Sequence, residues 1–112
     1  MNEQLRQPVR EVIELLVTRR YAELEALTKG VRLSANEIGK AISDYGRQLI
    51  MPPDDAFRFL DATEVQGAQP PRWSATMPLW TSEDGRSDLS LELTLIRVQK
   101  TFDIELDDIH VL

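Results

Sequence analysis

The only histidine of the chain, His110, follows Asp108 by two residues near the end of the sequence. Residues two apart on a strand point to the same side of the sheet, so we expect this carboxylate and this imidazole to share a face. A carboxylate beside an imidazole orients the ring, as in general-base catalysis. One histidine and one aspartate complete neither a metal site nor a catalytic triad, so we predict no metal and no cofactor. A hydrogen-bonded surface histidine is the alternative interpretation.

A second polar pair, Asp44 and Tyr45, ends a stretch with helical apolar spacing. Burial raises the pKa of a carboxyl group toward working pH, so an inward aspartate would suit proton transfer. Asp61 and Asp88 are alternative inward candidates. The opposing interpretation places Asp44 on the surface of the helix and Tyr45 in the core, with its hydroxyl at the rim. The candidate catalytic residues are therefore Asp44, Tyr45, Asp108 and His110.

Two tryptophans, Trp73 and Trp80, stand at odd and even positions of one predicted strand. A regular strand places them on opposite faces, so one enters the core and the other is exposed or covered by a neighbour. We predict an interface for a second copy or another protein at Trp80, beside Met77 and Leu79. The alternative is that Trp80 packs under the turn at residues 82–86.

The first half of the chain predicts three helices. Apolar residues recur every three or four positions over residues 3–20, with Pro8 either in the first turn or marking the true start near Gln7. A short helix follows at residues 21–28. Ser34 and Glu37 have the spacing of a capping box and open a third helix that ends at Gly46.

The second half predicts four strands, at residues 62–66, 72–81, 87–99 and 101–111. Leucines at alternate positions from Leu89 to Leu95 indicate a strand with one buried face. The alternation changes phase at Asp107-Asp108, where we expect a bulge. Pro78 cannot donate to a ladder and predicts an edge or a bulge. The fold class is therefore α+β, with three helices packed on a curved four-stranded antiparallel sheet in one domain, 1–112.

Composition limits the function classes. The chain has 112 residues, a net charge of −6 and no cysteine. Residues 61–112 hold ten acidic and four basic residues, which disfavours binding to nucleic acid. We expect no signal peptide and no membrane span, because neither the required n-region nor a long apolar run is present. Together with the lack of cysteine this favours a cytoplasmic protein.

Three helices followed by a curved antiparallel meander resemble the cystatin-like, nuclear transport factor 2-like α+β cone. The stretches that resemble a family of small bacterial domains of unknown function are Pro71–Trp73, Leu79–Thr81, Gly85–Leu89 and Asp107–Leu112. The resemblance implies helices in the concave face of the sheet. Enzymes with this cone use acidic residues inside its cavity, but their motifs do not map onto this chain residue by residue.

We therefore predict a non-enzymatic binding or protein-interaction module that forms a homodimer through its sheet. The alternative is a cavity in the cone that binds a small apolar ligand or performs acid/base chemistry of the hydrolase or isomerase type.

Overall fold

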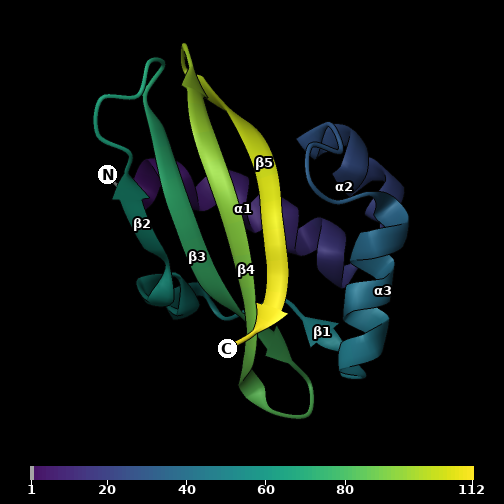
Figure 1. Cartoon of the computed structure of the whole chain (residues 1–112). Helices are drawn as coiled ribbons and strands as arrows, with labels where there is room; N and C mark the ends of the chain where they lie inside the picture. The colour runs from purple at the N-terminus through teal and green to yellow at the C-terminus, as the bar shows by residue number, and fades with distance from the viewer. Residues whose placement is uncertain (1) are drawn as a thin grey trace.

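The computed structural model describes residues 2–112 of the chain. Three α-helices come first, a short 3-10 helix lies in the middle, and the long strands occupy the C-terminal half (Figure 1). The elements in chain order are α1 (Asn2–Val17), α2 (Tyr21–Thr28), α3 (Ala35–Tyr45), β1 (Leu49–Ile50), η1 (Asp54–Phe59), β2 (Asp61–Glu64), β3 (Arg72–Thr81), β4 (Gly85–Val98) and β5 (Thr101–Val111).

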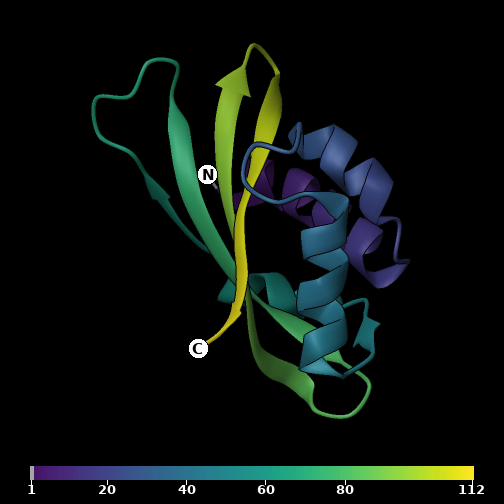
Figure 2. The same cartoon turned by 45° about the vertical axis from the view of Figure 1, so that its right-hand side comes forward.

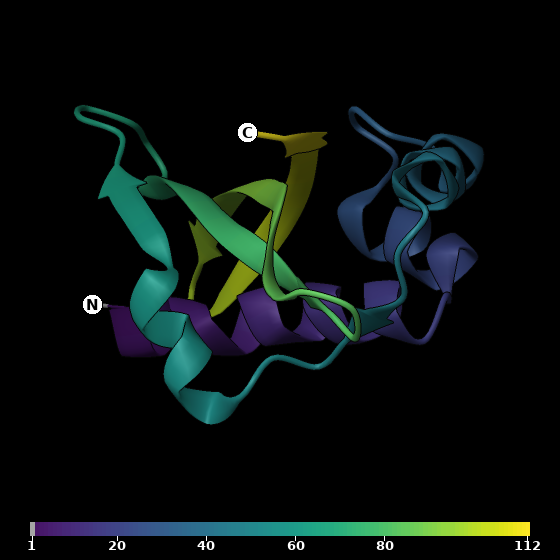
Figure 3. The same cartoon turned by 90° about the horizontal axis from the view of Figure 1, so that it is seen from below.

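The sheet is an antiparallel meander of β3, β4 and β5, with two short strands on the far edge of β3. β2 pairs with one end of β3 and β1 with the other, so that Leu49 faces Thr81 and Glu64 faces Trp73. The helices lie on one side of the curved sheet, with α2 and α3 beside β5 (Figure 2). Viewed from below, α1 runs along the same side of the sheet (Figure 3). The sheet therefore has an inner face, which the helices cover, and an outer face.

Apolar residues at alternate positions fill the space between the helices and the sheet. Leu89, Leu91, Leu93 and Leu95 are all at most 2% exposed, which confirms the predicted one-sided strand. β3 contributes a second row from Trp73 to Leu79. α1 contributes Leu5, Val9 and Val12, each 0% exposed. The core is one continuous cluster, as expected for two packed layers.

Local signals define both ends of α3 as the sequence predicts. The Ser34 hydroxyl accepts from the Glu37 amide at 3.2 Å, and the Glu37 carboxylate accepts from the Ser34 amide at 2.9 Å. Gly46 ends α3 in the left-handed conformation, with φ of 75°, which glycine adopts without steric cost.

Pro8 corrects one prediction. α1 begins at Asn2, so Pro8 lies inside the helix, neither in its first turn nor at its start. Proline removes one backbone donor and crowds the preceding turn. Leu5 before it and Val9 after it are completely buried, and their packing holds both sides of the helix against the core.

The sheet has five strands where four were predicted, because β1 is too short to show an alternating pattern. Both predicted irregularities are present. The register of β4 against β5 shifts between Glu92 and Leu93, which leaves Asp107 without a partner. A second shift follows Pro78, where β3 loses a donor.

Candidate functional site

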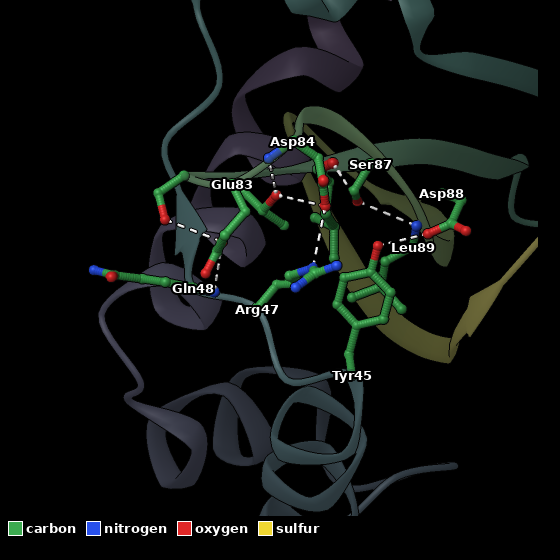
Figure 4. Close-up of polar contacts among 11 residues, drawn as sticks. Tyr45, Arg47, Gln48, Glu83, Asp84, Ser87, Asp88 and Leu89 are labelled. Carbon is green, nitrogen blue, oxygen red and sulfur yellow. Dashed lines mark hydrogen bonds and ion pairs between the residues drawn. The ribbon is translucent and has the colours of Figure 1, made fainter.

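Tyr45, one of the predicted site residues, meets the hairpin that joins β3 and β4 (Figure 4). Its hydroxyl donates to Asp88 Oδ1 at 2.5 Å. This bond to a carboxylate, reinforced by partial burial, raises the pKa of Tyr45 above its ordinary value. A tyrosine in this state is a hydrogen-bond donor at neutral pH and a poor general base. The left-handed turn at Gly46 places Tyr45 as the last residue of α3, facing the hairpin.

Arg47 and Gln48, which follow α3 closely, hold the same hairpin by further polar contacts. The Gln48 amide donates to Glu83 Oε1 at 3.2 Å, and the Gln48 carbonyl accepts from the Ser82 amide at 3.0 Å. Arg47 Nε lies 3.3 Å from Asp84 Oδ2. We call these contacts, together with Tyr45–Asp88, the hairpin clamp.

Within the clamp, the Ser87 side chain makes hydrogen bonds at the point where the β3–β4 ladder is irregular. The register moves from Pro78 opposite Ser90 to Trp80 opposite Arg86, so β4 has extra residues opposite Leu79. The Ser87 hydroxyl donates to the Leu79 carbonyl at 2.8 Å and accepts from the Leu89 amide at 3.1 Å. One side chain thus serves two backbone groups that the irregularity leaves without strand partners.

Asp44 does not join this cluster. It lies on the exposed side of α3 and accepts from Lys40 Nζ at 2.8 Å, which raises the pKa of Lys40. This is an i, i+4 pair of a solvated helix surface. Asp61, an alternative inward candidate, is exposed at the start of β2. Asp88, the other alternative, is exposed and bonded to Tyr45.

Asp108 and His110 share the outer face of the sheet and are joined there by Glu92. Asp108 Oδ2 lies 3.1 Å from His110 Nδ1, and Glu92 Oε2 lies 3.2 Å from Nε2. Glu92 and Asp108 are direct cross-strand partners. The side chains are 38%, 53% and 34% exposed for Glu92, Asp108 and His110. We call these three residues the outer-face trio.

The predicted interface residues separate into two groups. Met77 and Leu79 are 1% and 2% exposed and belong to the core, so they offer no surface to a partner. Trp80 points to the other side of β3, is partly buried, and has its ring centroid 6.1 Å from that of Phe59. Its cover is therefore the 3-10 helix η1 rather than the turn at residues 82–86.

Two arginines flank the aromatic pair. The guanidinium groups of Arg58 and Arg86 lie 4.9 and 4.4 Å from the centre of the Phe59 ring. Both distances fit cation–π contact. Phe59, Trp80, Arg58 and Arg86 are called the aromatic patch. A surface hollow of about 310 Å³ extends from it past Pro78 and Ser90 to Leu112, which is 83% exposed.

The interior between helices and sheet is packed with apolar side chains. Trp73, Met77 and Phe57 are each at most 4% exposed, and the alternating leucines complete the layer. The hollow beside the hairpin clamp, about 390 Å³, opens to solvent and is bordered by Tyr45, Arg47, Asp84, Arg86, Ser87 and Asp88. The polar side chains that could take part in catalysis or ligand binding thus lie at the surface, away from the packed interior.

Sequence reasoning did not identify Glu92 or Phe59. The alternation of β4 places Glu92 on the outer face, but only the strand register puts it opposite Asp108. Phe59 is the last residue of η1, and its contact with Trp80 depends on how η1 docks.

The fold and these sites define a small α+β domain with an antiparallel sheet covered on one face by helices. The chain belongs to the DUF7668 family, which is described as a domain of unknown function and whose model matches residues 13–112. The match includes every site described above. No curated protein and no solved structure matches the chain. None of the helices within residues 2–112 combines the length and apolar character needed to cross a bilayer.

Proposed function

We propose that this domain is a non-enzymatic protein-interaction module that forms a homodimer through the outer face of its sheet. The observation that carries the proposal is the aromatic patch. Trp80 and Phe59 are each partly exposed and contact each other, and two arginines stack on Phe59. Tryptophan and arginine are the residue types that contribute most to binding energy at protein interfaces.

The packed interior supports binding over catalysis. A cone enzyme needs a cavity with convergent polar groups, and the inward positions of β3 and β4 hold buried apolar side chains. Tyr45 and Asp88 satisfy each other, and their bond raises the pKa of Tyr45, which works against a role as a base. The function that we propose therefore does not include acid/base chemistry.

Charge supports a second copy of this chain as the partner. Within residues 2–112, Arg58 and Arg86 have no carboxylate within ion-pair distance, so their charges are available. Further along the same outer face lie the acidic residues Glu92 and Asp108. A two-fold axis between two such faces would bring the basic end of each protomer to the acidic end of the other.

Size-exclusion chromatography with light scattering, over a range of protein concentrations, tests the proposal. We expect the wild-type chain to dimerise and Arg58→Glu to weaken the dimer by about tenfold or more. Arg58 is exposed, so its substitution leaves the core intact. Lys100→Glu is the matched control, because it makes the same charge change in the β4–β5 turn at the opposite end of the sheet.

Two results would contradict the proposal that the chain forms a dimer. One is a monomer at every concentration, and the other is an equal effect of Arg58→Glu and Lys100→Glu. Trp80→Ala is a second variant, and we expect it to weaken the dimer at least as much as Arg58→Glu. Its folding is checked by circular dichroism, since Trp80 also packs against the core.

We propose further that the fold corresponds to the cystatin-like, nuclear transport factor 2-like cone and that the domain acts in a bacterial cytoplasm. The order of helices before the meander and the placement of all helices on one side of the sheet support the cone. The lack of cysteine supports a reducing compartment.

A further inference from the structure

The outer-face trio brings three potential metal ligands together from two adjacent strands. One oxygen of Glu92, one oxygen of Asp108 and one nitrogen of His110 lie within 4.8 Å of one another. Two ligands that are each about 2.0–2.2 Å from a tetrahedral zinc ion lie about 3.4 Å apart. The Glu92 Oε2 to His110 Nε2 distance of 3.2 Å is close to this spacing.

The bulge in β5 determines which aspartate joins the trio. Asp107 is the unpaired residue, and its carboxylate accepts from Thr94 Oγ1 at 2.6 Å and lies 3.2 Å from Arg32 Nε. Asp108 consequently faces Glu92 across the ladder. Its Oδ1 accepts from the Ile109 amide at 2.9 Å, which leaves Oδ2 directed at the imidazole.

The two carboxylates of the trio lack a lysine or arginine partner within ion-pair distance in the described part of the chain. His110 Nδ1 is buried and has no hydrogen-bond partner, although Asp108 Oδ2 lies 3.1 Å away, because the two groups are poorly aligned. Glu92 faces Nε2 and Asp108 faces Nδ1, so one of the two carboxylates must turn before both can share an ion on a single ring nitrogen. The unpartnered Nδ1 beside Asp108 is a polar atom that a bound ion would satisfy.

We propose that Glu92, Asp108 and His110 bind a divalent transition-metal ion such as Zn²⁺, with water completing the coordination. One imidazole with two carboxylates is a mixed nitrogen and oxygen donor set, which favours zinc or nickel over calcium and magnesium. Partial exposure of all three side chains leaves room for the water ligands. The ligands come from paired strands, so ion binding requires rotation of a side chain, Glu92 or Asp108, but no movement of the backbone.

The first measurement is calorimetric titration of the full, untagged chain with zinc chloride near neutral pH. We expect one ion per protomer and little competition from Ca²⁺ or Mg²⁺. Because His110 is the only histidine, its ring protons give one assignable set of NMR signals, and we expect these to shift with saturation. Repeating the titration on Arg58→Glu separates metal binding from dimerisation, since that substitution leaves the trio intact.

Three variants identify the ligands. We expect His110→Gln, Glu92→Gln and Asp108→Asn each to weaken zinc binding by about tenfold or more, at least the loss typical of residues around a metal site. Glu105→Gln is the matched control: it removes one negative charge from β5 outside the trio and should change affinity less than about threefold.

The proposal is wrong if zinc binds no more tightly than millimolar, or if the His110 signals stay in place while zinc binds. It is also wrong if Glu105→Gln weakens binding as much as Glu92→Gln, because the ion would then respond to the general acidity of the sheet. Circular dichroism of each variant confirms the fold, so that loss of binding reports on the ligands.

Discussion

The two halves of β4 are held in place by different interactions. From Leu89 to Leu95 the strand alternates regularly and presents buried leucines to the helices. From Gly85 to Asp88 the register is irregular, and polar groups replace apolar packing. Ser87 serves two backbone groups, and Asp88 accepts from Tyr45.

The difference shows how one strand combines two kinds of stabilisation. Burial of apolar surface does not depend on direction, so the leucine half tolerates small shifts in its neighbours. The hairpin clamp depends on hydrogen-bond geometry between segments that are 35–43 residues apart in the chain. Removal of one leucine should therefore cost far more than removal of one polar contact in the clamp.

The largest effect is expected in the leucine half. Leu93→Ala should lower the free energy of unfolding by about 2–5 kcal/mol, because it removes buried methyl groups and leaves a cavity. Urea denaturation followed by tryptophan fluorescence measures the change. Thr94→Ala, one residue further on the opposite face, is the matched control and should cost about 1 kcal/mol for the bond to Asp107. Equal costs would show that the inner face is not the main source of stability.

A smaller effect is expected in the hairpin clamp. Tyr45→Phe should cost about 0.5–1 kcal/mol, because it removes the bond to Asp88 at a site that water partly reaches. Tyr21→Phe is the control, since the Tyr21 hydroxyl has no hydrogen-bond partner within residues 2–112 and its loss should be nearly neutral. A cost above about 3 kcal/mol for Tyr45→Phe would mean that the clamp contributes as much as the core.

The smallest expected change in stability at neutral pH is that of Glu83→Gln. The pKa of Glu83 is lowered, mainly because its carboxylate accepts a hydrogen bond from its own backbone amide. Burial partly opposes this lowering. The Ser82 hydroxyl, the Gln48 amide and Arg47 each lower the pKa further. The stability from this carboxylate is therefore present above the ordinary glutamate pKa and is lost as pH falls through the lowered pKa.

Thermal denaturation of wild type and Glu83→Gln across pH tests this sign. Wild type should be the more stable of the two at pH 7, and the gap should close as the solution becomes acidic. A gap that widens toward low pH would contradict the assignment. Glu105→Gln should show a flatter dependence, because Glu105 lies on β5 opposite Thr94, outside the clamp.

Most of the local structure could be predicted because its signals lie within a few residues of one another. The capping box at Ser34, the left-handed end at Gly46 and the bulge at Asp107 follow from spacing or phase alone. Pro8 was misplaced because its local preference is opposed by the packing of α1, which the sequence pattern does not quantify.

The sites were less predictable because they depend on register and docking. Asp108 and His110 were paired from their spacing, but Glu92 joins them only through the alignment of β4 with β5. Trp80 was placed opposite Trp73 by alternation, whereas its contact with Phe59 requires η1 to dock against β3. Met77 and Leu79 are buried because the alternation of β3 continues through the irregularity at Pro78.

The sequence by itself determined which faces of the strands are apolar, where α3 begins and ends, and where β5 changes phase. These features follow from side-chain period and backbone preference, which act over a few residues. The tertiary structure alone decided that Tyr45 meets Asp88 and that Glu92 meets His110. Such pairs depend on strand register and helix docking, which the whole core sets together and no short stretch of sequence encodes.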